Sequence, residues 1–190
     1  MTTASQPDLS PGLVYRTSDL KQWSANPTRL ARRLVRDGQL VQLRHGLYAA
    51  PRRSRFGTVP PTTNALLDAF LDHTPWLLSG PPKWNALGLG ATALFATPLI
   101  YNTKRTGLFE LGGRTFMLRR VRFPREPSPE WYVVDLLMNA TQAGVARSDL
   151  AAALGRSVRA GAFDRDLLSE MADQYGTRDV QDCVAQASRP

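Results

Sequence analysis

Hydrophobic positions recur at helical spacing in residues 26–38, which read NPTRLARRLVRDG. Asn26 can cap the first turn, Pro27 suits the first helical position, and Gly38 can adopt the left-handed conformation that commonly ends a helix. These signals predict a helix of about three turns, with a capped start and a glycine stop.

The predicted helix has one apolar face and one basic face. With successive residues about 100° apart around the axis, four apolar residues share one side: Leu30, Ala31, Leu34 and Val35. The opposite side carries four arginines, Arg29, Arg32, Arg33 and Arg36. Two interpretations fit this pattern: a solvated outer face in a chain that uses arginine far more than lysine, or a surface that binds an anionic partner.

Elements on both sides of this helix complete a larger motif. Residues 15–23, YRTSDLKQW, predict a short helix followed by a turn. After the glycine stop the apolar period changes to two, so residues 39–50 predict a β-hairpin with Arg44 and His45 at its tip. Short helix, turn, basic helix and hairpin are the element order of a winged helix-turn-helix.

The rest of the chain predicts a mixture of helices and strands. Helical patterns occur in TTNALLDAFLDH, in PPKWNALGL and in four successive segments from residue 129 onward. Strand patterns occur in WLLS, PLIYNT, GLFEL and RTFMLRRVRF. Ser79 and Gly80, which end WLLS, are interpreted as a plain turn.

The net charge of +8 is concentrated near the N-terminus. Residues 1–56 hold ten Arg and Lys against three Asp, whereas residues 57–190 hold fourteen basic against thirteen acidic residues. This segregation predicts an anionic partner for the N-terminal segment, and nucleic acid is the commonest partner of a basic domain.

These patterns predict an α+β fold with four parts along the chain. We expect a flexible tail over residues 1–12, a winged helix-turn-helix that binds DNA over residues 13–50, and a basic linker over residues 51–61. Residues 62–190 are expected to form a second domain of helices with a small antiparallel sheet and a C-terminal helical segment.

Signals for membranes and export are missing from the sequence. Cys183 is the single cysteine, so no internal disulfide can form, which favours a reducing compartment. Residues 1–12 lack the basic and apolar regions of a secretory signal. The longest uncharged run, residues 85–103, is interrupted by glycines and a proline and is too polar for the roughly 20 apolar residues of a spanning helix. We therefore expect a cytoplasmic protein with no membrane partner.

Patterns for catalysis and cofactor binding are also scarce. The only histidines are His45 and His73, which supports neither a metal site nor a catalytic triad. Residues 88–93, GLGATA, satisfy the dinucleotide-binding pattern G-x-G-x-x-A, but they follow a helix-like segment rather than a strand. Carboxylates in the C-terminal helices are spaced as on solvated faces. We expect no enzymatic activity, no cofactor and no metal.

The basic elements supply the candidate DNA contacts. In a helix-turn-helix the second helix enters the major groove, with its N-terminal residues nearest the base edges. Base reading is expected from Thr28, Arg29 and Arg32 or Arg33, and a backbone contact from Arg36. Further phosphate or minor-groove contacts are expected from Arg16, Arg44, His45, Arg52, Arg53 and Arg55. Six more residues could form a second basic surface, for DNA flanks or RNA, or could simply be solvated: Lys104, Arg105, Arg114, Arg119, Arg120 and Arg122.

Three stretches resemble the AbiEi antitoxins of type IV toxin-antitoxin systems. Residues 15–51 are similar to the family's winged-helix opening, with Gly46, Leu47 and Tyr48 matching its G-x-Y after the basic hairpin. Residues 77–91, LLSGPPKWNALGLGA, resemble its serine-glycine turn and N-A-L-G-L helix end. Finally, LIYNTKRTGLFELGGRTFMLRRV resembles its hairpin with a glycine turn. The likeness extends from residue 13 to about residue 155.

This resemblance implies a function for each half of the chain. The N-terminal domain would bind operator DNA at inverted repeats and act as a transcriptional repressor of its own operon. The C-terminal antitoxin domain would counter a co-encoded nucleotidyltransferase toxin. Antitoxins of this type are thought to act without a stable toxin complex, so direct contact is not implied. Two alternatives stay open: a winged-helix enzyme or RNA-binding factor, and a structural module that binds a protein partner.

Overall fold

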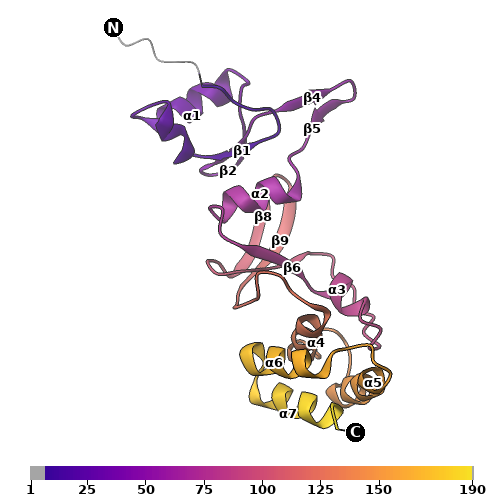
Figure 1. Ribbon diagram of the computed structural model, residues 1–190. Coiled ribbons are helices and arrows are strands. Elements are labelled where there is room, and N and C mark those ends of the chain that lie inside the picture. Colours follow the sequence, from indigo (N-terminus) through magenta and orange to yellow (C-terminus); the bar gives the residue numbers. More distant parts are fainter. Residues whose placement is uncertain (1–6, 190) are drawn as a thin grey trace. The chain divides into compact units, whose positions relative to one another are not determined.

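The computed structural model describes residues 7–189 and contains both helices and small antiparallel sheets (Figure 1). Its internal contacts separate two compact units. The first comprises the described residues up to Trp76 together with Thr103–Leu118, and the second comprises Leu77–Asn102 together with the described residues from Arg119 onward. The predicted α+β class is confirmed.

The N-terminal part of the first unit has the predicted helix and hairpin. In chain order it contains β1 (Val14–Arg16), the 3-10 helix η1 (Asp19–Gln22), α1 (Pro27–Arg36), β2 (Val41–Arg44) and β3 (Leu47–Ala49). The three strands form one antiparallel sheet in the order β1-β3-β2. The helix expected in YRTSDLKQW is a single 3-10 turn, and β1 was not predicted because three residues are too few to show an alternating pattern.

A small core holds this segment together. The apolar face of α1 packs with buried residues from η1, the sheet and the connection after α1, including Leu20, Leu40 and Tyr48. The backbone N–H of Gly12 donates to the Ala50 carbonyl at 2.8 Å, and that of Ser10 donates to the hydroxyl oxygen of Tyr15 at 2.9 Å. Hydrogen bonding to the sheet therefore begins N-terminal to residue 13. Residues 1–6 of the expected tail lie outside the described residues.

Three further elements complete the first unit. A two-stranded ribbon, β4 (Arg52–Ser54) and β5 (Gly57–Val59), occupies the segment expected to be a linker. It is followed by α2 (Thr63–Phe70). The hairpin of β8 (Gly107–Leu111) and β9 (Arg114–Arg120) contributes its residues up to Leu118, and the rings of Phe70 and Phe109 are 5.1 Å apart.

The backbone conformation of the turn between β8 and β9 favours its two glycines. Gly112 and Gly113 have φ angles of 57° and 76°, a region that side chains with a Cβ rarely adopt. The space beside Gly112 is also limited, because a Cβ there would lie 3.4 Å from the side chain of Leu43. The predicted hairpin with a glycine turn is confirmed.

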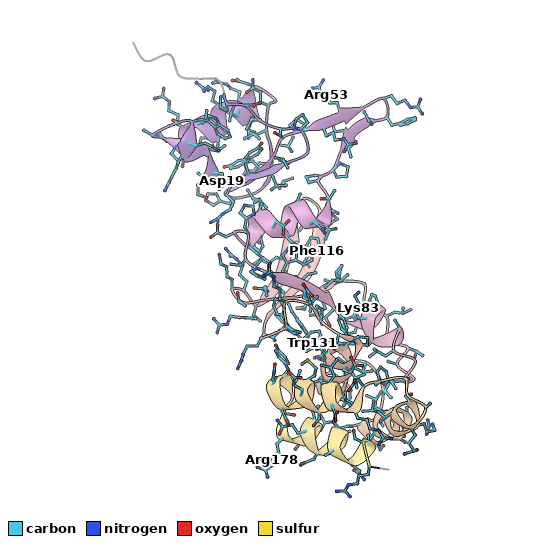
Figure 2. The ribbon with its side chains drawn as sticks, viewed as in Figure 1. Asp19, Arg53, Lys83, Phe116, Trp131 and Arg178 are labelled. Carbon is cyan, nitrogen blue, oxygen red and sulfur yellow. The ribbon has the colours of Figure 1, made fainter. Side chains whose placement is uncertain are left out.

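The second unit contains two strands and five helices among its described residues: β6 (Trp76–Ser79, from Leu77 onward), α3 (Pro81–Asn85), β7 (Leu99–Asn102), α4 (Pro129–Met138), α5 (Arg147–Arg159), α6 (Arg165–Tyr175) and α7 (Arg178–Ala187). Helix α4 packs against α6 and α7, and α5 packs against α7. Residues 130–137 of α4 are all buried, so this helix lies at the centre of the helical group. Figure 2 labels Trp131 on α4, one of its largest buried side chains.

The division into units differs from the boundary expected at residues 51–61. Thr103–Leu118 belong with the N-terminal segment, although Leu77–Asn102 of the other unit separate the two segments along the chain. Packing between distant segments depends on contacts that no local pattern encodes. Among residues 7–189, no helix is long and apolar enough to cross a membrane.

Candidate nucleic-acid interface

Helix α1 is fixed at both ends by local hydrogen bonds. The side-chain oxygen of Asn26 accepts from the backbone N–H of Arg29 at 3.0 Å, and Pro27 begins the helix. Gly38, with φ of 70°, lets the chain turn back so that the N–H groups of Gln39 and Leu40 donate to the Leu34 carbonyl. An N-cap of this kind stabilises a helix by about 1 kcal/mol. The predicted start and stop of the helix are confirmed.

The two faces of α1 differ as the spacing predicted. Leu30, Ala31 and Leu34 are at most 5% exposed. The other face carries four exposed arginines: Arg29, Arg32, Arg33 and Arg36. These arginines, with Trp23, Ser24 and Asn26, line a concave surface of about 500 Å³. Thr28 is exposed in the first turn of the same helix.

Little negative charge compensates this arginine face. The guanidinium of Arg36 approaches the Asp37 carboxylate at 3.4 Å, a long and exposed contact. Within residues 7–189, no ion pair joins Arg29, Arg32 or Arg33 to a carboxylate. Four like charges along one helix face repel each other. An exposed ion pair such as Arg36–Asp37 contributes little to stability. An anion placed over the face would relieve that repulsion.

The hairpin tip carries a second group of cations. Arg44 ends β2, and its guanidinium carbon lies 5.6 Å from the Phe70 ring centroid and 5.2 Å from that of Phe109. Arg105 lies over the same Phe70 ring at 4.5 Å. Stacking on an aromatic ring occupies the face of a guanidinium and leaves its N–H edge available for hydrogen bonds. Arg44, Arg105, Arg16 and His45 all line a cavity of about 360 Å³.

Asp72 pairs with Arg16, one of the residues that line this cavity. It forms ion pairs with Arg16 and with Lys104, the latter at 3.0 Å. The hydrogen bond from Lys104, followed by the positive charge of Arg16, lowers the pKa of the Asp72 carboxyl. Asp72 and His73 adopt φ angles of 58° and 55°, which are unusual for residues with a side chain. Arg16 is bound to a carboxylate, unlike Arg29, Arg32 and Arg33 of α1.

The remaining predicted DNA contacts are the arginines of the β4–β5 ribbon and the six residues of the second basic surface. Arg52, Arg53 and Arg55 are exposed on the β4–β5 ribbon, where Figure 2 labels Arg53. Of the predicted second basic surface, Lys104, Arg105 and Arg114 belong to the first unit and Arg119, Arg120 and Arg122 to the second. Arg114 donates to Thr63 and to the Pro61 carbonyl, and Arg119 donates to Asn139 and Gln142. Both of these guanidinium groups thus bind other parts of their own unit.

The second unit contains a buried polar cluster that the sequence pattern did not predict. Asp135 of α4 is fully buried and accepts hydrogen bonds from Ser79, Trp84 Nε1 at 2.8 Å, the Tyr101 hydroxyl at 2.7 Å and Asn139 Nδ2 at 3.0 Å. Burial raises the pKa of the Asp135 carboxyl, and the hydrogen bonds from Ser79, Trp84 and Tyr101 oppose that rise. The prediction that carboxylates of the C-terminal helices lie on solvated faces is wrong for Asp135 and for Glu130, which is 6% exposed.

This cluster is structural. Ser79, Trp84, Tyr101 and Asp135 are each at most 3% exposed, so none is open to a substrate. Together they join β6, α3, β7 and α4. The interpretation of Ser79 as part of a plain turn was therefore incomplete. A signal was present in the sequence: a lone aspartate inside the apolar run WYVVDLLM is a buried polar group that needs partners.

The structure also places the dinucleotide-like pattern. Residues 88–93 follow α3 and form a turn and an irregular segment, with no strand directly before them and no helix after them. The helical segment predicted before the pattern is confirmed over Pro81–Asn85. In the described part of the chain, no group of three or more His, Cys, Asp or Glu side chains is arranged to hold a metal ion.

A protein-family model matches the segment predicted to be a winged helix-turn-helix. The family model described as transcriptional regulator, AbiEi antitoxin, matches residues 16–51. No curated protein matches the chain. Among solved structures, the crystal structure of the RV2827C protein from Mycobacterium tuberculosis is similar, with a TM-score of 0.48 and 17% sequence identity over 92% of this chain and 74% of that one. The resemblance inferred from the sequence is thus confirmed over residues 16–51, which match the AbiEi antitoxin family of transcriptional regulators.

Proposed function

We propose that this protein binds double-stranded operator DNA through α1 and regulates transcription of its own operon. The observation that carries this proposal is the exposed face of four arginines on a capped helix, in the segment that matches a family of transcriptional regulators. A helix of this size fits the major groove of B-DNA, which is about 12 Å wide. Arginine suits this position because its planar guanidinium can bind phosphate or the guanine edge through two hydrogen bonds.

The contacts are expected to divide by position on α1. Thr28, Arg29 and Arg32 lie in its first two turns, where a recognition helix approaches the bases. Arg36 lies in the last turn, where contact with the phosphate backbone is expected. Arg44 and His45 at the hairpin tip, with Arg16 beside them, would bind flanking phosphates. This arrangement makes binding strongly dependent on salt, because each phosphate contact releases counterions.

The salt dependence of duplex binding tests the proposal directly. The logarithm of affinity should fall linearly with the logarithm of salt concentration, by roughly 0.9 for each phosphate neutralised. Arg36→Ala should reduce that slope by about one unit. Arg156→Ala is the matched control, because Arg156 is exposed in the last turn of α5 as Arg36 is in that of α1. No measurable duplex binding at about 50 mM salt would contradict the proposal.

We further propose that the protein is the antitoxin of a type IV system and counters a co-encoded nucleotidyltransferase toxin. Support comes from the family match at the N-terminal segment and from the resemblance of residues 77–91 and 99–121 to the same family. The activity would be non-enzymatic. Repression at inverted repeats would let the antitoxin control the synthesis of both proteins.

Co-expression can separate repression from antitoxicity. The variant Arg32→Glu/Arg33→Glu should lose repression of a reporter placed behind the operon's own promoter. With the nucleotidyltransferase expressed from an unrelated promoter, the same variant should still restore growth, because both substitutions lie on the exposed face of α1. The full chain is used, since Thr103–Leu118 belong to the same unit as the N-terminal segment. Failure of the wild-type chain to restore growth would remove the antitoxin proposal and leave the DNA-binding proposal standing.

A further inference from the structure

The β4–β5 ribbon is a formed hairpin rather than a loose connection. Arg53 pairs with Thr58 and Ser54 with Gly57 in an antiparallel register. The Ser54 hydroxyl closes the turn, donating to the Gly57 carbonyl at 3.0 Å and accepting from the Phe56 N–H at 3.2 Å. The two strands form a sheet of their own, so their outer edges have no strand partner among residues 7–189. Figure 1 shows the ribbon extending from the part of the unit that contains α1 and β2.

The ribbon combines positive charge with an exposed aromatic ring. Residues 51–61 contain Arg52, Arg53 and Arg55 and no acidic residue. Phe56 occupies the turn and is 85% exposed. The guanidinium carbon of Arg55 lies 4.6 Å from the Phe56 ring centroid. An aromatic ring is thus presented to solvent at the tip of a narrow, uniformly cationic arm.

Two physical features identify the partner that suits such an arm. Three positive charges without a compensating carboxylate favour a polyanionic partner. The exposed ring favours a partner with a flat or apolar surface, because covering the ring removes apolar area from water. DNA offers both, because phosphates border each groove and base pairs present stacking faces between them. Proteins that bind the minor groove frequently insert an apolar side chain such as Phe between base steps, which partly unstacks them and bends the duplex.

We propose that Phe56 is a DNA-contacting wedge: the ribbon enters the minor groove beside the segment bound by α1, its arginines bind phosphates, and the Phe56 ring stacks on a base step and bends the duplex. This inference rests on the proposed function, since it assigns the ribbon to the same DNA. It adds Phe56 to the DNA interface. This residue carries no charge and makes no contribution to counterion release.

The test compares full-length Phe56→Ala with Arg53→Ala on a duplex of about 30 bp taken from upstream of the gene. Affinity is measured across a salt series, and bending is followed by energy transfer between dyes at the two ends of the duplex. Phe56→Ala should weaken binding by about 5- to 150-fold, as expected for one stacked base, and should lose the bend while leaving the salt slope unchanged. Arg53→Ala should instead reduce the slope by about one unit.

Two further variants control for local structure. Phe56→Trp keeps a stacking ring and should retain both affinity and bend. Thr58→Ala changes an exposed residue of the same ribbon that does not reach the tip, and should behave as wild type. Loss of binding in Thr58→Ala to the same extent as in Phe56→Ala would overturn the wedge, because it would assign the effect to the fold of the ribbon.

Other outcomes separate this inference from the proposed function. If Arg32→Glu/Arg33→Glu abolishes binding while Phe56→Ala binds and bends DNA as wild type does, the wedge is excluded and the DNA-binding function stands. If Phe56→Ala leaves DNA binding intact but abolishes binding to vesicles of anionic lipid, the tip serves a membrane surface instead. If the wild-type chain binds no duplex at all, both the proposed function and the wedge are excluded.

Discussion

Replacing Arg32 and Arg33 together by glutamate is expected to abolish specific DNA binding, with a loss of at least about 100-fold in affinity. Both residues lie on the exposed face of α1 and take no part in the core formed by Leu30, Ala31 and Leu34. The substitution removes two guanidinium groups and places two carboxylates where phosphates would lie. The remaining arginines of the face, Arg29 and Arg36, would then be partly neutralised within the protein.

A charge-matched control is available in the second unit. Arg165→Glu/Arg178→Glu makes the same change in net charge at two exposed positions, each the first residue of a helix, where a carboxylate is favourable. This control should bind DNA within a few-fold of wild type, as measured by fluorescence anisotropy with a labelled duplex. An equal loss in both double variants would show that only the total charge matters and that α1 has no special role.

The conservative variant Arg32→Lys/Arg33→Lys extends the same experiment to base recognition. Lysine keeps the charge but lacks the planar fork that binds a guanine edge through two hydrogen bonds. If these residues read bases, the free energy of binding to the operator weakens by roughly 1 to 3 kcal/mol per lost contact, while the free energy of binding to random duplex changes little. Equal behaviour on both duplexes would assign Arg32 and Arg33 to the phosphate backbone.

Replacing Asp135 by alanine is expected to lower the free energy of unfolding of the second unit by about 3 to 5 kcal/mol. The carboxylate accepts hydrogen bonds from Ser79, Trp84, Tyr101 and Asn139, all of them buried. Removing it leaves the donors of Ser79, Trp84 and Tyr101 without their acceptor in an environment that excludes water. Because a domain is typically stable by about 5 to 15 kcal/mol, this single change can unfold most of the unit.

Urea unfolding followed by far-ultraviolet circular dichroism measures this effect. Met138→Ala is a control on the same helix, since Met138 is 38% exposed and its truncation should cost less than about 1 kcal/mol. Asp135→Asn should give an intermediate loss, because the amide keeps one acceptor oxygen and turns an N–H group toward the existing donors. A change below about 1 kcal/mol for Asp135→Ala would contradict the structural role of the cluster.

Local pattern was sufficient for the helix that carries the candidate interface. The bounds and the two faces of α1 follow from Asn26, Pro27 and Gly38 and from apolar residues at helical spacing. These properties are determined within a few neighbouring residues, by backbone hydrogen bonds and by the angle between successive side chains. The hairpin tip at Arg44 and His45 and the glycine turn at Gly112 and Gly113 are local in the same sense.

Sequence alone thus determined the mixed fold class, the arginine face, and the resemblance of residues 16–51 to the AbiEi regulators. Only the tertiary structure decided what Asp135 and Arg44 do. Ser79, Trp84 and Tyr101, which donate to Asp135, and the two rings beside Arg44 all lie more than 20 residues away along the chain. In the structure, the segment expected to be a linker forms the ribbon that presents Phe56. Its two strands were not predicted, because strands of three residues are too short to show an alternating pattern. The face of a helix or strand on which a side chain lies is determined by its neighbours in sequence. The residues that it contacts depend on the free energy of packing between distant segments.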